Sequence, residues 1–231
     1  MTYNIIGDIH GRDVWYELVR DDAVNIFVGD YFDPYEPFSF AQVMHNFRMI
    51  IDYKRRNPDT VLLYGNHDLH YLLNDPYERY SRYNAEHSYE IRYEFEQVRD
   101  LMNGVAYSIG DDVLVTHAGV SKPWYEKWIG SYNDEATGVV ARNINDLWDN
   151  DMSAFNYGNN SGGIMDRGGM APTSSPMWIR PGYLKEYNIF TDNDYRQVVG
   201  HTQQKNISRM TPKLTFVDCL MFSTKSYVIE K

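Results

Sequence analysis

Short apolar runs and helical patterns alternate along the first third of the chain. Three apolar runs, each ending at or followed by glycine, are typical of buried strands: 3–7, 23–28 and 60–64. Apolar residues recur at helical spacing over 40–51, and Pro58 marks the end of that helix. A shorter helix is expected within 12–20. This strand–helix–strand rhythm predicts parallel βαβ units.

The alternation continues in the rest of the chain. A long helix is expected whose apolar face contains Ile91, Phe95, Val98 and Met102. The runs 105–109 and 113–116 flank a Gly-Asp-Asp turn and predict a hairpin. A further helix is expected around 140–148. Three more strands are expected, at 197–201, 213–218 and 226–230.

The stretch 157–176 differs in composition because it is rich in glycine, asparagine and proline. A loop of this length inside a compact domain is often a lid or a binding loop. The sequence contains no internal repeat and no block of like charge. We therefore expect a single domain over 1–231, with a Gly/Pro-rich loop insertion near 157–176.

Composition narrows the classes of function. The chain has 231 residues, one Cys, and a formal net charge of −10 from 32 acidic and 22 basic residues. One cysteine excludes an intramolecular disulfide framework and favours a reducing compartment. The acidic balance argues against a nucleic-acid binder, so metal ions or a few arginines would hold an anionic substrate. The chain shows no signal-peptide pattern and no apolar run of membrane-spanning length, so we expect a cytoplasmic protein without membrane contact.

Metal-capable residues come directly after five predicted strand ends. The segments are Gly-Asp-Ile-His-Gly at 7–11, Gly-Asp-Tyr-Phe-Asp at 29–33, Gly-Asn-His-Asp at 65–68, Thr-His-Ala-Gly at 116–119 and Gly-His-Thr at 200–202. Binding sites in open α/β sheets lie beyond the carboxyl ends of strands, so the five segments are expected to converge. Carboxylate, imidazole and amide oxygen together suit divalent ions, and a carboxylate can bridge two of them. Each segment alone is a weak signal, but the ordered set predicts a metal site.

These segments resemble the signature of the calcineurin-like metallophosphoesterases. The resemblance is to the phosphoprotein phosphatase branch, with its bacterial and phage-type Ser/Thr phosphatases and its diadenosine tetraphosphate hydrolases. Gly-Asn-His-Asp-Leu-His at 65–70 and His-Ala-Gly-Val at 117–120 look most like the hydrolases, whereas Val-Gly-His-Thr at 199–202 looks like the phage-type phosphatases. The resemblance implies an α+β fold of four layers, α/β/β/α, in which helices flank two packed mixed β-sheets.

The resemblance also implies residue roles at the matching positions. A dinuclear metal site would use Asp8 and His10 for the first ion, Asp30 as a bridge, and Asn66, His117 and His201 for the second ion. Asn66 would also contact the substrate. Manganese is the favoured metal, with Fe, Zn, Ni or Co as alternatives.

The implied mechanism is direct attack on phosphorus by a hydroxide that bridges the two ions, since divalent ions lower the pKa of a bound water. The ions also neutralise charge on the phosphate oxygens. His67 resembles the family's general acid, and Asp33 resembles its carboxylate partner. Such a partner fixes the tautomer of the ring and raises its pKa.

The chain departs from the family pattern where phosphate is bound. Pro34 and Tyr35 follow Asp33, where the protein phosphatases usually have Arg-Gly. Phosphate nevertheless favours a bidentate cation. Two arginines are therefore candidates for substrate binding: Arg180, in a Trp-x-Arg context like that of phage-type members, and Arg167, in the Gly-rich loop.

We expect an enzyme that hydrolyses a phosphomonoester on a protein or a small molecule. Two alternatives stay open: hydrolysis of dinucleoside polyphosphates or other phosphoanhydride or phosphodiester substrates, and a catalytically silent binding module. Outside the signature, we expect a structural role for His70, support of His201 by Asp218, and burial of Cys219. The native substrate and the oligomeric state stay open.

Overall fold

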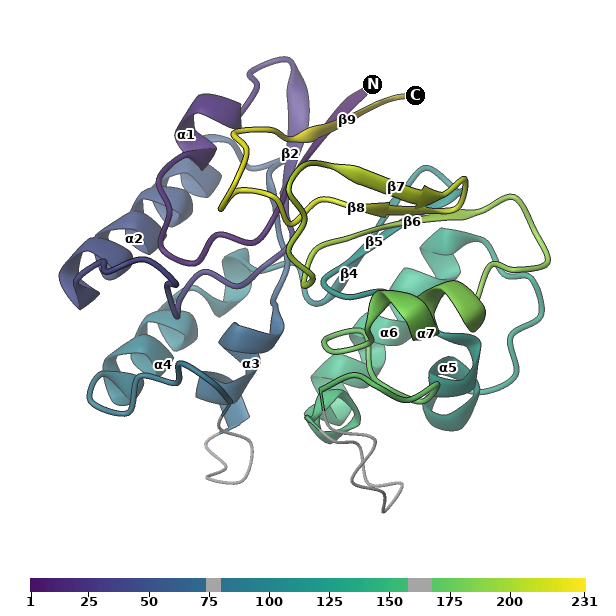
Figure 1. Cartoon of the computed structure of the whole chain (residues 1–231). Coiled ribbons are helices and arrows are strands. Elements are labelled where there is room, and N and C mark those ends of the chain that lie inside the picture. The colour runs from purple at the N-terminus through teal and green to yellow at the C-terminus, as the bar shows by residue number, and fades with distance from the viewer. Residues whose placement is uncertain (74–79, 158–167) are drawn as a thin grey trace.

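The two ends of the chain meet at the first of two β-sheets, where the Lys231 N–H donates to the Met1 carbonyl (Figure 1). The structure is a computed structural model that describes residues 1–73, 80–157 and 168–231. The first sheet has the strand order β3-β2-β1-β9. Its strands are β1 (Thr2–Ile6), β2 (Ala23–Phe27), β3 (Val61–Leu62) and β9 (Tyr227–Glu230). The sheet is mixed because β1, β2 and β3 are parallel whereas β9 is antiparallel to β1.

The second sheet has the order β4-β5-β6-β8-β7 and is also mixed. Its strands are β4 (Ala106–Ile109), β5 (Val113–Thr116), β6 (Arg196–Val199), β7 (Ser208–Thr211) and β8 (Leu214–Phe216). The hairpin β4–β5 and the pair β7–β8 are antiparallel, while β5, β6 and β8 are parallel. The carboxyl ends of β5 and β6 therefore lie at the same edge of this sheet.

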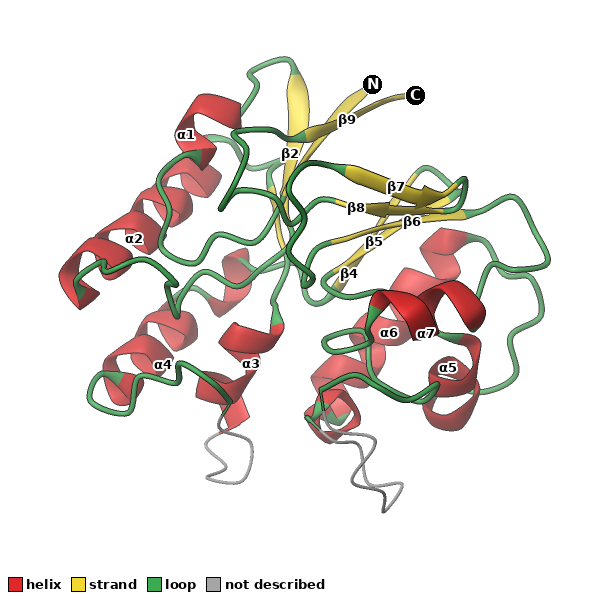
Figure 2. Cartoon of the chain, viewed as in Figure 1, coloured by secondary structure: helices red, strands yellow, loops and turns green. Residues whose placement is uncertain are grey.

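A buried apolar cluster joins the two sheets. It combines side chains of the first sheet, such as Ile5 and Ile26, with side chains of the second, such as Val115 and Val198. The opposite faces of the sheets carry the helices, on one side α1 to α4 and on the other α5 to α7 (Figure 2). The order of layers is α/β/β/α, as expected from the sequence.

Three helices of the described chain, α2, α5 and α7, have local reasons to begin where they do. The described helices are α1 (Trp15–Leu18), α2 (Phe40–Arg56), α3 (Asn66–Leu73), α4 (Ser88–Gln97), α5 (Lys122–Trp128), α6 (Thr137–Asn150) and α7 (Pro181–Glu186), with short 3-10 turns η2 (Arg99–Leu101) and η3 (Met152–Phe155). Helix α2 begins with a capping box between Ser39 and Gln42. Helix α5 is capped by Ser121, and α7 begins at Pro181, as proline favours. Among the described helices, none is both long and apolar enough to cross a membrane.

Several predicted elements are shorter in the structure than expected, among them the strand expected at 60–64, of which only β3 forms. The long helix from Ile91 ends at Gln97, and Met102 is extended, because the Asn103 N–H and side chain bond Leu62 of β3. The helix expected within 12–20 covers only α1, since the Arg12 carbonyl accepts a hydrogen bond from Asn46 instead of starting a helix. The strand expected at 213–218 is present only as β8 (Leu214–Phe216). Strand β7 and helices α5 and α7 were not predicted.

Candidate active site

The five strand-end segments converge at one cleft of about 730 Å³. Asp8 follows β1, Asp30 follows β2 and Asn66 opens α3 after β3. From the second sheet, His117 follows β5 and His201 follows β6. The site therefore lies where the carboxyl ends of parallel strands from both sheets meet, as the strand-end pattern predicts.

Left-handed backbone conformations are concentrated at this cleft. His10, Asp30, Asp33 and His201 have φ values of 46°, 56°, 57° and 62°. Residues other than glycine rarely adopt positive φ, and such strain is typical of functional sites whose geometry the surrounding structure enforces.

Two of the motif glycines are required by close approach. A Cβ atom on Gly65 would lie 2.2 Å from Asp30 Oδ1, and one on Gly200 would lie 2.1 Å from Asp8 Oδ1. The absence of a side chain at these two positions lets the backbone of one segment touch the carboxylate of another. Steric crowding therefore explains why glycine stands next to a metal-capable residue in these two segments.

The hydrogen bonds of the histidine rings leave lone pairs aimed at the acidic groups. His10 Nδ1 lies 3.0 Å from the Phe32 carbonyl, and His117 Nδ1 lies 2.9 Å from the Val28 carbonyl, so both nitrogens carry the proton. Both Nε2 atoms are then acceptors, and each lies 3.5 Å from Asp30 Oδ2. Two acceptors facing one another across this gap need a cation between them.

The same arrangement recurs at Asn66. Its Oδ1 lies 2.7 Å from His117 Nε2 and 2.9 Å from His201 Nδ1. His201 Nε2 lies 3.1 Å from the Trp178 carbonyl and donates to it, which leaves Nδ1 as an acceptor. An amide oxygen and two imidazole lone pairs therefore meet beside Asp30.

Burial sets the charge of these groups. It lowers the pKa of His10 to about 4 and brings the pKa values of His117 and His201 below their ordinary value. All three rings are neutral at pH 7, which is the form that binds a metal ion. Burial alone would raise the pKa of Asp30, but the charge of the neighbouring His67 and a hydrogen bond from the His67 backbone N–H help to outweigh burial and keep that carboxyl ionised.

Asp33 is the centre of a second buried group. Its Oδ2 lies 2.8 Å from His67 Nδ1 and 2.7 Å from His70 Nε2, and its Oδ1 accepts a hydrogen bond from the Tyr71 hydroxyl. The Tyr80 N–H donates to His70 Nδ1 over 3.4 Å, so the proton of that ring is on Nε2, which lies close to Asp33 but at a bent angle. One carboxylate is thus surrounded by three donors.

These contacts fix the protonation of Asp33 and His67. Burial alone would raise the pKa of Asp33, but the hydrogen bonds from His67 and His70 hold it below its ordinary value. Burial alone would lower the pKa of His67, but the charges of Asp30 and Asp33 raise it. His67 donates from Nδ1 to Asp33 and lines the cleft, so its Nε2 is the atom that can donate a proton there.

Of the two arginines expected to bind phosphate, only Arg180 lies within the described residues. Arg180 lines the cleft, and its Nε donates to the Gly168 carbonyl over 2.9 Å. No other hydrogen bond ties its guanidinium to the described part of the chain, so its Nη atoms are available to a phosphate. Arg167 lies outside the described residues.

Two acidic residues of the site have roles that sequence reasoning missed. The Asp68 carboxylate accepts hydrogen bonds from the Asp30, Tyr31 and Gly65 N–H groups at 2.8–3.0 Å, and so holds two of the converging segments together. The expectation for Asp218 is wrong, because both ring nitrogens of His201 have other partners.

Asp218 lies against Asp8 instead. Burial and the charge of Asp30 raise the pKa of Asp218 to about 7, and a contact with Asp8 partly opposes this rise. Within the described chain its Oδ1 is buried without a hydrogen-bond partner. Asp218 thus places a third carboxyl group beside Asp8 and Asp30 at the edge of the cleft.

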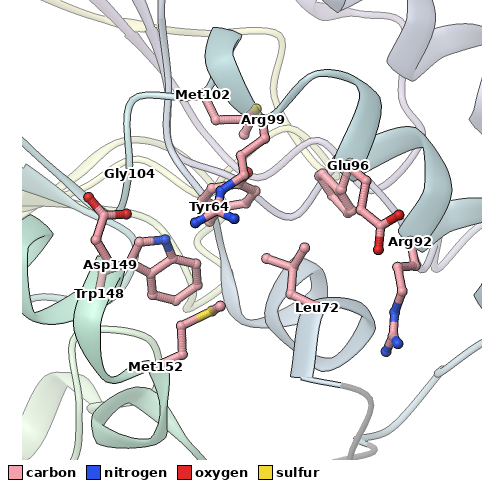
Figure 3. A pocket seen from close by; sticks show the side chains of 11 residues that line it. Tyr64, Leu72, Arg92, Glu96, Arg99, Met102, Gly104, Trp148, Asp149 and Met152 are labelled. Atoms are coloured by element: carbon pink, nitrogen blue, oxygen red, sulfur yellow. The ribbon is translucent and has the colours of Figure 1, made fainter.

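A separate cavity of about 710 Å³ lies between α4 and α6 (Figure 3). Tyr64 and Trp148 stack in its wall with ring centroids 5.3 Å apart, and Arg92, Arg99, Glu96 and Asp149 lie around it. Its lining contains no histidine. The acceptor-rich metal groups and the proton donor lie in the other cleft, which is therefore the candidate active site.

Two buried groups of Asp and His, namely Asp8/His10/Asp30 and Asp33/His67/His70, each bring their potential ligand atoms within 4.8 Å of one another. They are consistent with a dinuclear metal site.

Comparison with known proteins agrees with this geometry. A model of the calcineurin-like phosphoesterase family matches residues 1–205. Among solved structures, the chain is similar to a protein serine/threonine phosphatase from Saccharomyces cerevisiae, described as having similarity to human phosphatase PP5, with 17% identity and a TM-score of 0.56. That match covers 94% of this chain but 66% of the yeast chain, less than two thirds of its length, and at this identity it shows the fold alone. No curated protein sequence matches the chain.

The family match extends over all five strand-end segments in full, so one sequence model accounts for each of the segments that the fold brings to the cleft. Because the match covers most of the chain and the layered fold and buried Asp/His groups agree with it, the chain belongs to the calcineurin-like phosphoesterase family of metal-dependent hydrolases that act on ester bonds.

Proposed function

We propose that the chain is a dinuclear-metal-dependent phosphomonoesterase that acts on a phosphoprotein or a phosphorylated small molecule. One observation carries the metal part of this proposal. His10 and His117 donate from Nδ1 to backbone carbonyls and turn their Nε2 lone pairs toward the same Asp30 oxygen, 3.5 Å away. A divalent cation on each side of Asp30 would satisfy these facing acceptors.

The assignment of ligands follows from the directions of these groups. We assign Asp8 and His10 to one ion, Asn66, His117 and His201 to the other, and Asp30 to both. Two divalent ions bound there would supply Lewis acidity toward phosphate oxygens and lower the pKa of a coordinated water. Manganese is our first choice, because the oxygen and imidazole ligands suit it. We interpret the Asp33/His67/His70 group differently, since its members are already joined by hydrogen bonds.

His67 is the proposed general acid. Its Nδ1–H is held by Asp33, and its Nε2–H would donate to the oxygen of the leaving group as the P–O bond breaks. Arg180 is the proposed phosphate clamp, because the Nη side of its guanidinium is available while Nε is anchored on Gly168. The Asn66 amide group would give a further polar contact to substrate.

We also propose that the chain forms a single domain and that the protein is cytoplasmic. The residues of the site come from positions 8 to 201, which supports a single domain. Cys219 is buried, and a lone thiol that is kept reduced fits a cytoplasmic location.

The test compares three substrate classes on metal-stripped protein reloaded with Mn²⁺. We expect p-nitrophenyl phosphate and a phosphoserine peptide to be hydrolysed faster than bis-p-nitrophenyl phosphate and diadenosine tetraphosphate. Faster hydrolysis of the diester or the dinucleotide would replace the monoester proposal. Absence of any turnover, with two ions bound per chain, would favour a silent binding module.

Two variants separate the proposed roles. Asp8→Asn should lower both Mn²⁺ content and turnover. His67→Asn should keep the metal content and lower turnover roughly 100-fold on alkyl phosphates, with a smaller loss on p-nitrophenyl phosphate, whose leaving group needs no proton. Equal losses on the two substrates would contradict the general-acid assignment.

A further inference from the structure

Tyr35 forms the wall of the cleft next to the proposed acid. The rings of Tyr35 and His67 both pack edge-to-face against His10, with centroid distances of 4.8 Å and 5.1 Å. Tyr35 and Ser81 line the same cleft as His67. Because the acid protonates the leaving oxygen, the leaving group must lie on the side of the cleft that contains His67, Tyr35 and Ser81.

Arg82 lines an adjoining cavity with Asp33 and Pro34, and two contacts hold it against the Tyr35 side of the cleft wall. Its guanidinium carbon lies 4.2 Å from the centroid of the Tyr35 ring, and its Nη1 donates to the Pro34 carbonyl over 2.9 Å. Its backbone is left-handed, with φ of 69°, so the chain turns sharply at this residue. Aromatic stacking and one hydrogen bond fix the orientation of the guanidinium at an exposed position.

The rest of the Arg82 guanidinium is not used by the described chain. None of the described carboxylates lies within ion-pair distance of it, and Nε and Nη2 make no hydrogen bond to any described residue. A long cationic side chain loses rotamer freedom when it is fixed, and here its donors are fixed without an anion. The arrangement is what a binding site for an oxyanion provides.

Arg82 and Arg180 are associated with different sides of the metal groups. Arg180 lines the cleft together with His201, whereas Arg82 lines the adjoining cavity together with Asp33 and Pro34. The two arginines therefore do not form a single clamp around one phosphoryl group. The Arg180 guanidinium lies near the ligands that follow β5 and β6, whereas the Arg82 guanidinium lies against the Tyr35 wall beside the proposed acid.

We propose that Arg82, clamped on Tyr35, forms a leaving-group subsite that selects phosphate esters whose leaving group carries its own anionic group, a carboxylate or a second phosphate. This inference rests on the proposed phosphomonoesterase function and specifies its substrate class. The metal groups and Arg180 take the phosphoryl group, and Arg82 takes the second anion.

Binding of non-hydrolysable analogues tests the subsite without turnover. The probes are 4-carboxybenzyl phosphonate and the methyl ester of its carboxyl group, which keeps the phosphonate but lacks the carboxylate charge. Both are titrated by calorimetry into Mn²⁺-loaded protein. The wild-type chain should bind the carboxylate about two- to fivefold more tightly than the ester, the range expected for an exposed charge pair, and the preference should fall at high salt. Arg82→Gln should reduce the preference to about one.

Two further variants are matched to this test. Arg142→Gln removes the same charge from an exposed position on α6 and should keep the preference of the wild-type chain. Tyr35→Leu should weaken the preference, because the guanidinium loses its support, whereas Tyr35→Phe should keep it. Pyrophosphate compared with phosphate gives a second probe, since Arg82→Gln should weaken pyrophosphate binding more.

The outcomes separate this inference from the proposed function. An unchanged preference in Arg82→Gln, or no preference in the wild-type chain, overturns the subsite even if p-nitrophenyl phosphate is hydrolysed. Failure of both phosphonates to bind also overturns it. A preference that depends on Arg82 without turnover of any monoester supports the subsite and overturns the proposed reaction.

Discussion

His70 Nε2 lies 2.7 Å from Asp33 Oδ2, the same oxygen that His67 Nδ1 approaches at 2.8 Å. Two imidazoles thus share one carboxylate oxygen, and only one of them lines the cleft. Because the proton of His70 is fixed on Nε2 by the Tyr80 N–H, His70 acts as a permanent donor to Asp33. We infer that it positions the carboxylate that in turn positions the proposed acid.

Replacing His70 should impair proton donation without removing the metal ions. His70→Phe removes the donor to Asp33, so we expect roughly a tenfold loss of kcat on alkyl phosphates and a smaller loss on p-nitrophenyl phosphate, with little change in KM. His70→Gln offers an N–H in its place and should recover part of the rate. Equal losses on both substrates, or loss of bound Mn²⁺, would show that His70 supports the fold rather than the acid.

Tyr71→Phe tests the third donor of the same network. The Tyr71 hydroxyl donates to Asp33 Oδ1 and accepts from the Asn84 N–H over 2.9 Å. Since two donors to Asp33 remain, the loss on alkyl phosphates should be about two- to fivefold, smaller than for His70→Phe. Combining the two substitutions should cost more than the product of the single losses, because Asp33 then keeps only His67. Strictly multiplicative losses would argue against a shared network.

The sequence predicted best those site residues whose place in the fold follows from their position directly after a strand. Asp8, Asp30 and His117 each follow a short apolar strand at once, and glycine precedes two of them. Strand ends of a parallel sheet meet at one edge, so sequence position alone predicts their convergence. The same alternation of strands and helices predicts βαβ units, whereas the four-layer fold was expected from the family resemblance.

The sequence was least informative where contacts join distant segments without a periodic pattern. The bond from Tyr71 to Asp33 spans 38 positions and that from Arg82 to Pro34 spans 48. Neither Tyr71 nor Arg82 directly follows a predicted strand or belongs to a repeat at helical spacing. Asp218 was associated with the wrong partner because it follows β8, the neighbour of β6 in the second sheet, whereas its contact with Asp8 joins the two sheets. Such contacts depend on how loops fold back over the sheet edge.

Removing the metal ions should cost stability, and one substitution should reverse part of that cost. Asp8 is buried beside Asp30 and Asp218, so the metal-free protein confines three carboxyl groups in one place. Metal-free Asp8→Asn should therefore be at least as stable as the metal-free wild-type chain, but it should gain less from Mn²⁺. Thermal unfolding with chelator and with excess Mn²⁺ measures both. A metal-free variant that is clearly less stable than the metal-free wild type would contradict this account.

Gly200→Ala should weaken metal binding through a steric contact. The new Cβ would lie 2.1 Å from Asp8 Oδ1, so the carboxylate must move. We expect a loss of Mn²⁺ affinity of about 10- to 100-fold, as is usual when the support of a ligand is disturbed. Gly182→Ala is the control, because nothing lies within 4 Å of its Cβ and the residue is in α7. Affinity unchanged in Gly200→Ala would show that Asp8 is not a ligand or that the site adapts freely.

Cys219 should make the protein less stable in alkali. Burial raises the pKa of its thiol from 9.0 to about 11, and its sulfur faces the Ser223 and Lys225 carbonyls at 3.9 and 3.6 Å. Between these pH values the folded chain holds a proton that the unfolded chain has lost, so the free energy of unfolding falls as pH rises, by about 3 kcal/mol at most. Urea unfolding at intervals from pH 8.5 to 11 should show a shallower fall in Cys219→Ala. Buried tyrosines contribute the same slope to both proteins and cancel in the difference, so parallel curves would mean that the thiol ionises in the folded chain as easily as in the unfolded one.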